Sequence, residues 1–167
     1  PPGLGEVRQA LRRIVKDATR AGDVVGRIRE LVNKAPPRKE LLDINEAIQE
    51  VIEVTRGEAA KNGASVQTVL AEGLPLVEGD RVQLQQVLLN LIVNAVQAMG
   101  GGAEGPRELL ITSAPAEANS VLVAVKDSGP GVAPASLEHL FTPFYTTKPD
   151  GLGMGLSICH SIIEAHG

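Results

Sequence analysis

The segment LQQVLLNLIVNAVQAM, residues 84–99, decides how this chain folds. It is apolar on most of its faces, and a helix of that kind belongs in a hydrophobic core. Asp80 is a good N-cap residue before it, and glycines at 100–102 follow it. The sequence therefore predicts one core helix over 81–99.

Two asparagines, Asn90 and Asn94, stand four positions apart in this helix and so share one of its faces. Asparagine is a poor helix former and is costly in a core unless it is hydrogen-bonded. Its amide offers an oxygen to a hard cation and a nitrogen to phosphate oxygens. The alternative is that both side chains cap neighbouring backbone groups, and the pair alone does not decide between the two.

Strands and helices are predicted on both sides of the core helix, from apolar residues that recur every second position or every third to fourth. The expected order is a strand at 40–43, a helix at 46–61 with Asn45 as N-cap, a strand at 64–70, the core helix, strands at 107–113 and 120–127, a loop at 129–153 and a helix at 155–165. This order predicts an α/β (α+β) fold in which helices cover one face of a mixed sheet.

Residues 6–34 predict one long helix with a heptad rhythm. A lone helix with such a stripe needs a partner, and we expect a second copy of the chain, so a homodimer. The alternative is packing against its own domain. Prolines at 36 and 37 break the helix, which predicts two units, 1–35 and 36–167. The seam positions are Val7, Leu11, Ile14, Ala18, Ala21, Val25, Ile28 and Val32.

Charge and composition exclude several classes of protein. Residues 6–34 contain eight Lys/Arg and four Asp/Glu, whereas residues 35–167 contain eight and sixteen. An acidic main unit in a chain with 2 % aromatic residues argues against nucleic-acid binding. No apolar stretch reaches membrane-spanning length, so no membrane contact is expected. The single cysteine, Cys159, fits a reducing, cytoplasmic compartment and is expected to be buried.

Asp127 ends the apolar strand VLVAVKD and enters Ser-Gly-Pro-Gly. A carboxylate at a strand end can accept a hydrogen bond from an exocyclic amine such as that of adenine, and Gly129 and Gly131 let backbone approach a flat ring. An ordinary Asp-Ser-Gly turn is the alternative.

A Gly-x-Gly-x-Gly run at residues 151–155 opens the last helix, where backbone N–H groups attract phosphate. Thr146, Thr147 and Lys148 precede it and suit terminal phosphates. Phe141, Phe144 and Tyr145 cluster in the same loop, where they also anchor it. His139, His160 and His166 show no metal-ligand spacing, and none is expected to be catalytic.

Taken in order, these motifs resemble the N, G1, F and G2 boxes of sensor histidine kinases over about residues 6–167. The matching segments are Asn90-Leu-Ile-Val-Asn94-Ala, Asp127-Ser-Gly129-Pro-Gly131, Phe141-Thr-Pro-Phe144 and Gly151-Leu-Gly153-Met-Gly155-Leu. Gln97, where many kinases have Lys, and Phe-Tyr-Thr-Thr-Lys148 look like the nitrogen-regulatory and oxygen-sensing nitrogen-fixation branch.

The resemblance implies a Bergerat-type two-layer sandwich that binds ATP and Mg²⁺. Asp127 would bind the adenine amine, Asn94 would ligate Mg²⁺, and Asn90 would hold phosphate or the ion's shell. Residues 132–154 would form the ATP lid, with Lys148 on the γ-phosphate side. The remaining nucleotide-binding residues would be Gln97, Gly129, Gly131, Thr146, Thr147, Gly151, Leu152, Gly153, Gly155 and Leu156.

By the same resemblance, residues 6–34 look like the second helix of the dimerisation and phosphotransfer hairpin, and a response-regulator receiver domain would be a partner. Two departures matter: the helix with the phospho-accepting His is absent, and family members continue with strands after His-Gly. The chain therefore looks like a piece of a longer protein, and autophosphorylation by this piece alone is not expected. The resemblance allows a parent protein that is anchored to a membrane.

Three functions remain open at this point: a histidine kinase core, a related ATPase of the gyrase, chaperone or mismatch-repair type, and a dimerising module without catalysis. The resembling ATPases have Glu where Asn90 stands, and an asparagine cannot act as a general base. Position 90 therefore favours phosphoryl transfer to a nucleophile supplied elsewhere over hydrolysis.

Overall fold

The computed structural model describes residues 3–15, 18, 22, 38–100, 105–148 and 151–167. The chain divides into two units, Pro1–Pro36 and Pro37–Gly167. In the first unit residues 4–15 are helical, and the predicted seam residues Val7, Leu11 and Ile14 are exposed. Most of the remainder of the predicted 6–34 helix lies outside the described residues.

The described residues of the second unit form two small sheets. In one, β1 (Glu40–Leu42) pairs antiparallel with β3 (Val77–Gly79). The other has the order β2-β4-β5, formed by β2 (Ala64–Leu70), β4 (Arg107–Pro115) and β5 (Val121–Asp127). Strands β2 and β4 are parallel and β4 and β5 antiparallel, so the sheet is mixed, as predicted.

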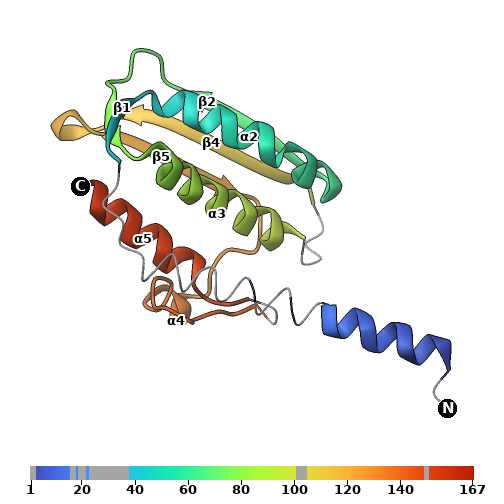
Figure 1. Cartoon of the computed structure of the whole chain (residues 1–167). Helices are drawn as coiled ribbons and strands as arrows, with labels where there is room; N and C mark the ends of the chain where they lie inside the picture. The colour runs from blue at the N-terminus through green and yellow to red at the C-terminus, as the bar shows by residue number, and fades with distance from the viewer. Residues whose placement is uncertain (1–2, 16–17, 19–21, 23–37, 101–104, 149–150) are drawn as a thin grey trace. The chain divides into compact units, whose positions relative to one another are not determined.

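Helices α2 (Ile44–Lys61) and α3 (Arg81–Met99) lie on one face of the mixed sheet, and α5 (Gly155–His166) packs against α3 (Figure 1). The side chains of β4 alternate accordingly: Leu109, Ile111 and Ser113 are buried, and their neighbours are not. The predicted fold class is thus confirmed. The fully buried large side chains are Ile48, Ile92, Met99, Leu109, Ile111 and Met154.

The two core helices begin at aspartates. Asp80 caps α3 as predicted, because its carboxylate accepts from the Gln83 N–H at 3.2 Å. The predicted cap at Asn45 is wrong: Asp43 caps α2 by accepting from the N–H groups of Asn45 and Glu46. The helix therefore begins earlier, at Ile44.

Asn45 instead ties the start of α2 to the sheet. Its amide nitrogen donates to the Ala71 carbonyl at 2.9 Å, and its amide oxygen accepts from the Ser113 hydroxyl at 2.7 Å. A tertiary contact therefore decides the role of this side chain.

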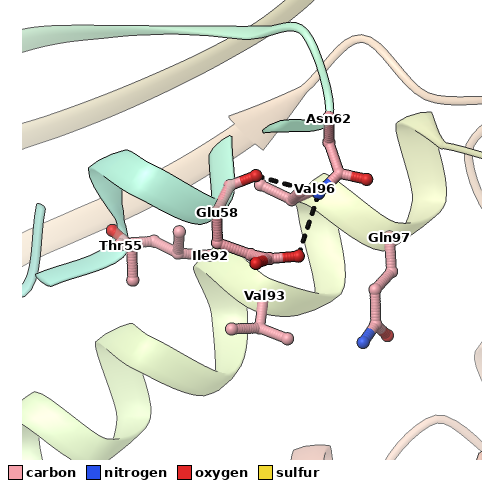
Figure 2. Close-up of a pocket in the computed structure, with 7 residues that line it drawn as sticks. All are labelled: Thr55, Glu58, Asn62, Ile92, Val93, Val96 and Gln97. Carbon is pink, nitrogen blue, oxygen red and sulfur yellow. Dashed lines mark hydrogen bonds between the residues drawn. The ribbon is translucent and has the colours of Figure 1, made fainter. Parts of the chain in front are cut away.

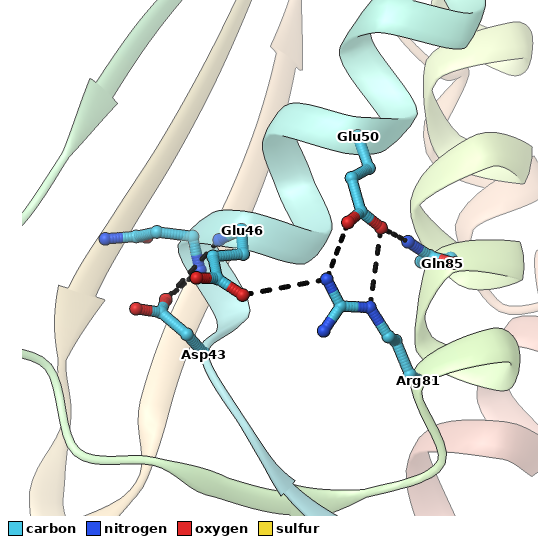
Figure 3. A network of polar contacts seen from close by, with 6 residues as sticks. Asp43, Glu46, Glu50, Arg81 and Gln85 are labelled. Carbon is cyan, nitrogen blue, oxygen red and sulfur yellow. Dashed lines mark hydrogen bonds and ion pairs between the residues drawn. The ribbon is translucent and has the colours of Figure 1, made fainter.

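A second set of polar contacts joins α2 to the start of α3 (Figure 3). The Arg81 guanidinium lies 2.7 Å from Glu50 and 3.7 Å from Glu46, and Gln85 also donates to Glu50. The hydrogen bond from Arg81 is the main cause that lowers the pKa of the Glu50 carboxyl. The contacts hold the two helices side by side at the end opposite to Asn94.

The segment predicted as a loop at 129–153 contains a short helix, α4 (Pro134–Leu137), and several turns. Pro134 stands at the first helical position, where its missing N–H costs nothing. A four-residue helix is too short to give a periodic signal in the sequence, which explains the miss. Within the described residues, no helix is both long and apolar enough to cross a membrane.

Asp80→Ala should lower the free energy of unfolding by about 1 kcal/mol, because α3 loses its cap. Burial alone would raise the pKa of the Asp80 carboxyl, but N–H groups of Arg38, Gln83 and Val82 together lower it. The contribution of the Asp80 cap to the free energy of unfolding is therefore complete at pH values above 3.8, the ordinary pKa of the carboxyl. It disappears as the pH falls through the lower pKa of the folded state.

Urea unfolding at neutral pH and at acid pH would check this. Asp80→Asn is the matched control, because an asparagine also caps but does not titrate. An Asp80→Asn protein as unstable as Asp80→Ala at neutral pH would show that the cap is not the cause.

Candidate nucleotide site

The predicted polar face of α3 is present at the edge of the core. Asn90 and Asn94 are half-buried and Gln97 is exposed, whereas Ile92 and Val96, on the other side of the helix, are buried. The helix thus presents one amide face to solvent while its apolar faces pack. This placement leaves the asparagine amides accessible to a ligand, as the motif requires.

Asp127 lies at the end of β5 with its carboxylate partly engaged. Its Oδ1 accepts from the Gly129 N–H at 2.8 Å, and within the described residues Oδ2 has no hydrogen-bond partner. One oxygen is therefore held by the backbone while the other can accept from a ligand amine.

Sequence reasoning missed Ser128, which fixes this turn. Its hydroxyl donates to the Pro106 carbonyl at 2.8 Å and accepts from the Glu108 N–H at 2.9 Å. It also lies 3.4 Å from the Met99 sulfur. The side chain therefore joins the residue after Asp127 to the start of β4 and the end of α3. Only its place between Asp127 and Gly129 marked it in the sequence.

Gly129 brings this turn against α3. A Cβ atom on Gly129 would lie 2.6 Å from Asp127 Oδ1 and 3.4 Å from the Cβ of Ala98, the residue after Gln97. The absence of a side chain is thus what allows the Asp127 turn to approach the helix. Gly131 has a φ of +75° and open space around it. A glycine is therefore favoured at this position by the backbone conformation and not by close neighbours.

Lys148 reaches the same face of α3 from the predicted lid. Its ammonium Nζ lies 3.0 Å from Gln97 Oε1 and 3.3 Å from Asn94 Oδ1. Burial lowers the pKa of this lysine. The structure therefore places the cation of the lid on two of the predicted site residues.

The glycine run folds against the lid's own backbone. The Phe144 N–H donates to the Gly153 carbonyl at 2.8 Å, and Gly153 has a φ of +66°. A Cβ atom on Gly151 would collide with the Thr146 hydroxyl, which itself accepts from the Lys148 N–H at 3.1 Å. These glycines therefore shape the lid, a role that the helix-terminus argument did not predict.

Helix α5 begins at Gly155 without a side-chain cap, since its N-cap residue is the buried Met154. Among the described residues, no side-chain cap therefore satisfies the first backbone N–H groups of the helix, which suits an anionic ligand. Leu152 and Leu156, on either side, are half-buried, and Thr147 is exposed.

Cys159 connects α5 to the asparagine face. It is buried, as predicted, and its thiol lies 3.9 Å from the Val87 carbonyl. Burial raises the pKa of the thiol, and a hydrogen bond with Asn90 acts in the opposite direction. The thiol therefore lies beside a predicted phosphate- or metal-binding amide and stays protonated at neutral pH.

The aromatic cluster anchors the lid only in part. Phe141 and Phe144 are 52 % and 65 % exposed, so they are not buried in the core. The Tyr145 hydroxyl donates to Ser136 at 2.9 Å, and the Phe141 ring lies 5.1 Å from the His160 ring. Polar and ring contacts, rather than a buried aromatic core, hold this segment.

A shallow pocket lies between α2 and α3 (Figure 2). Of the predicted nucleotide-binding residues, only Gln97 lines this pocket. The predicted site, formed by α3, the β5 turn and the lid, is therefore distinct from this pocket. Among the described residues no cluster of His, Cys, Asp and Glu could hold a metal ion. The residues that line the pocket are Thr55, Glu58, Asn62, Ile92, Val93, Val96 and Gln97.

A family model described as histidine kinase-, DNA gyrase B-, and HSP90-like ATPase matches residues 79–167. The chain belongs to this family. The match begins just before α3 and includes every predicted site residue, so the site lies within the ATPase-like domain.

Among curated proteins, the C4-dicarboxylate transport sensor protein DctS of Rhodobacter capsulatus is 40 % identical over 168 residues, which cover 99 % of this chain and 25 % of that protein. The sensor protein FixL of Bradyrhizobium diazoefficiens is 39 % identical over 166 residues, with 99 % and 32 % covered. The sensor histidine kinase TmoS of Ectopseudomonas mendocina is 35 % identical, with 99 % and 17 % covered. The chain thus spans a third or less of each of these relatives.

Solved structures of histidine kinases are also similar to this chain. The catalytic domain of the histidine kinase ThkA superposes with a TM-score of 0.68 at 36 % identity, over 77 % of this chain and 82 % of that one. ShkA in complex with AMPPNP gives a TM-score of 0.77 at 27 % identity, over 99 % and 34 %. The ATPase-like domain of this chain is therefore the catalytic domain type of sensor histidine kinases.

Gly129→Ala should weaken the binding of adenine nucleotides about tenfold, or roughly 1.4 kcal/mol. The new Cβ would displace Asp127 Oδ1, which lies 2.6 Å away, from its bond to the backbone. Calorimetric titration with ADP would measure the change.

Gly57→Ala is the matched control, because Gly57 lies inside α2 and a Cβ there meets nothing within 4 Å. It should leave affinity unchanged and raise stability by about 0.5–1 kcal/mol. If the wild type and Gly129→Ala bound ADP with equal affinity, the assignment of Asp127 to the nucleotide site would be refuted.

Proposed function

We propose that this chain is the ATP-binding catalytic part of a two-component sensor histidine kinase. The longer protein would transfer the γ-phosphoryl group of ATP to a histidine outside this chain, and a receiver-domain aspartate of a response regulator would then accept it. The observation that carries the proposal is the convergence of Asp127, the amide face of α3 and the Lys148 ammonium along one helix.

The geometry supports a role for each group. Asp127 Oδ2 would accept from the adenine amine, since Oδ1 is already held by the Gly129 N–H. The ammonium of Lys148 and the uncapped start of α5 would attract the phosphates. Catalysis would then consist of positioning and of neutralising negative charge, which is what phosphoryl transfer requires.

The donor set fits Mg²⁺. Oxygen ligands are those that Mg²⁺ prefers, and Asn94 Oδ1 already accepts from a cation, 3.3 Å away. Asn94 would be the direct ligand, and Asn90 would hold a phosphate oxygen or a water of the ion. When bound, the ion would neutralise negative charge on the phosphates.

Two partners belong to the same proposal. A solved structure shows ThkA in complex with the response regulator protein TrrA, and this chain superposes on ThkA there with a TM-score of 0.78 at 28 % identity. By analogy, a receiver domain would be the phosphoryl acceptor here. A second copy of the chain would cover the seam residues of 6–34, of which Val7, Leu11 and Ile14 are exposed in a single chain.

We also propose the nitrogen-regulatory and oxygen-sensing branch, on the strength of Gln97 and the Thr-Thr-Lys148 segment. FixL stands among the relatives, but DctS has nearly the same identity. The branch therefore rests on these motif residues alone.

Hydrolysis of ATP is the second candidate, because the family name includes gyrase- and HSP90-like ATPases. Asn90 argues against it, since an amide cannot remove a proton from water. The neighbour of Asn90 on α5 is a thiol whose pKa burial raises, so it does not supply a base either.

Asp127→Asn should weaken ADP binding about tenfold or more, because the amide replaces an acceptor charge opposite the adenine amine. Calorimetry with ADP and AMPPNP, with and without Mg²⁺, would measure this. Glu117→Gln, an exposed charge change in the β4–β5 turn, is the control and should bind like the wild type. An unchanged affinity of Asp127→Asn would refute the adenine assignment.

In the full-length protein, Asn94→Ala should reduce phosphohistidine formation from ATP by about a hundredfold, because charge stabilisation at the phosphates is lost. Peptide mapping should place the phosphohistidine outside residues 1–167. Glu53→Gln, which changes an exposed residue on α2 outside the proposed site, should not alter the rate. A phosphoryl group on His139, His160 or His166 would overturn the proposed transfer.

A further inference from the structure

The Lys148 ammonium lies where the proposed function places a metal ion. It lies 3.3 Å from Asn94 Oδ1, the oxygen assigned above to Mg²⁺, and 3.0 Å from Gln97 Oε1. Both partners are neutral amides, whose oxygens are cation ligands as well as hydrogen-bond acceptors. The chain therefore carries its own cation on the ligand atom.

We propose that Lys148, held by Gln97, is a built-in substitute for the divalent ion, and that this pair determines how strongly nucleotide binding depends on metal. The inference rests on the proposed function, because it takes Asn94 as the metal ligand. The ammonium and the ion exclude each other, since they compete for one oxygen and repel each other as like charges.

The chemistry of lysine suits such an exchange. An ammonium is a compact charge on a flexible four-carbon stem, so it can leave Asn94 and follow an incoming phosphate without moving the helix. With a metal-free nucleotide, the ammonium stays beside the phosphates as their counter-charge. With a metal-bound nucleotide, it gives up Asn94 to the ion.

Gln97 fixes the position of the Lys148 ammonium on α3. Its bond to Lys148 is the shorter of the two, and it stands one helical turn from Asn94 on the same face. A leucine at 97 would leave the ammonium with one oxygen, and a lysine would repel it. Gln97 is therefore a positioning residue that acts through Lys148.

The backbone of Lys148 is held independently of its side chain. The Lys148 N–H donates to the Thr146 hydroxyl at 3.1 Å, and the Lys148 carbonyl accepts from the Gly151 N–H at 3.1 Å. The backbone at Lys148 is thus tied to the glycine run that leads into α5. The backbone at Lys148 can therefore stay in place while the ammonium moves between Asn94 and a phosphate.

The first experiment measures the dissociation constant of ADP by calorimetry, in Mg²⁺ and in EDTA, for the wild type and Lys148→Met. The ratio of the EDTA value to the Mg²⁺ value should be at least about tenfold larger in Lys148→Met, because only the metal-free complex needs the ammonium at Asn94. Gln97→Leu should give an intermediate ratio. Lys39→Met removes an exposed lysine beside β1 and should match the wild type.

Equal weakening of ADP binding by Lys148→Met in Mg²⁺ and in EDTA would overturn the inference, since Lys148 would then be an ordinary phosphate contact. Circular dichroism and thermal melting would show that the variant is folded, and Lys148→Gln offers a second substitution with a polar side chain. A wild type that does not bind ADP at all would refute the proposed function.

The second experiment needs no nucleotide. It therefore distinguishes a failure of this inference from a failure of the proposed function. Mn²⁺ is added to the free protein, and paramagnetic broadening of the Asn94 side-chain amide signal is followed by NMR. Lys148→Met should show half-broadening at an Mn²⁺ concentration about tenfold lower than the wild type, because the competing ammonium is gone. Identical titrations would refute the competition even if ADP binds as proposed.

Discussion

The packing of one helix against a mixed sheet is the constraint on which the rest of this structure depends. The apolar faces of α3 bury Ile92, Val96 and Met99 against α2 and the sheet. Because the helix has one rotational setting that achieves this burial, the direction of Asn90 and Asn94 is fixed by hydrophobic packing. A site formed by polar residues is thus oriented by residues that take no part in its chemistry.

Close contacts of the backbone also position the segments of the proposed site. Gly129 lets the Asp127 turn reach the end of α3, and Ser128 ties the same turn to β4. In the lid, Gly153 adopts a positive φ and accepts from Phe144. These contacts bring a strand end, a helix face and a loop together although they are far apart in the sequence.

The site is consequently held by two kinds of interaction with different strengths. Buried apolar surface fixes α3 and the end of β5, whereas the lid is held to α3 by an ammonium on two amide oxygens. In the proposed site, the buried apolar contacts would stay the same when a ligand binds, whereas the contacts of Lys148 would change, since a phosphate or a metal ion would compete for the same atoms. If the site binds ATP as proposed, a rigid adenine side would lie beside an adjustable phosphate side, which is the arrangement that phosphoryl transfer from a nucleotide requires.

The sequence by itself determined the core helix, the approximate places of four strands, the cap at Asp80 and the motif residues of the proposed site, because periodicity, capping and glycine placement are local properties. The three-residue strand β3 was not predicted. The family match to residues 79–167 agrees with that motif order. Local signals failed where a side chain had two possible partners. Asn45 looked like a cap, but bonds to Ala71 and Ser113 were available only in the folded chain.

The tertiary structure alone decided the contacts between distant segments. No spacing in the sequence indicated that Ser128 would bond to Pro106 and Glu108, that Cys159 would lie beside Asn90, or that Lys148 would reach Asn94. Hydrogen bonds and close contacts of this kind depend on distances of a few ångströms between elements, and such distances follow from packing of the whole domain.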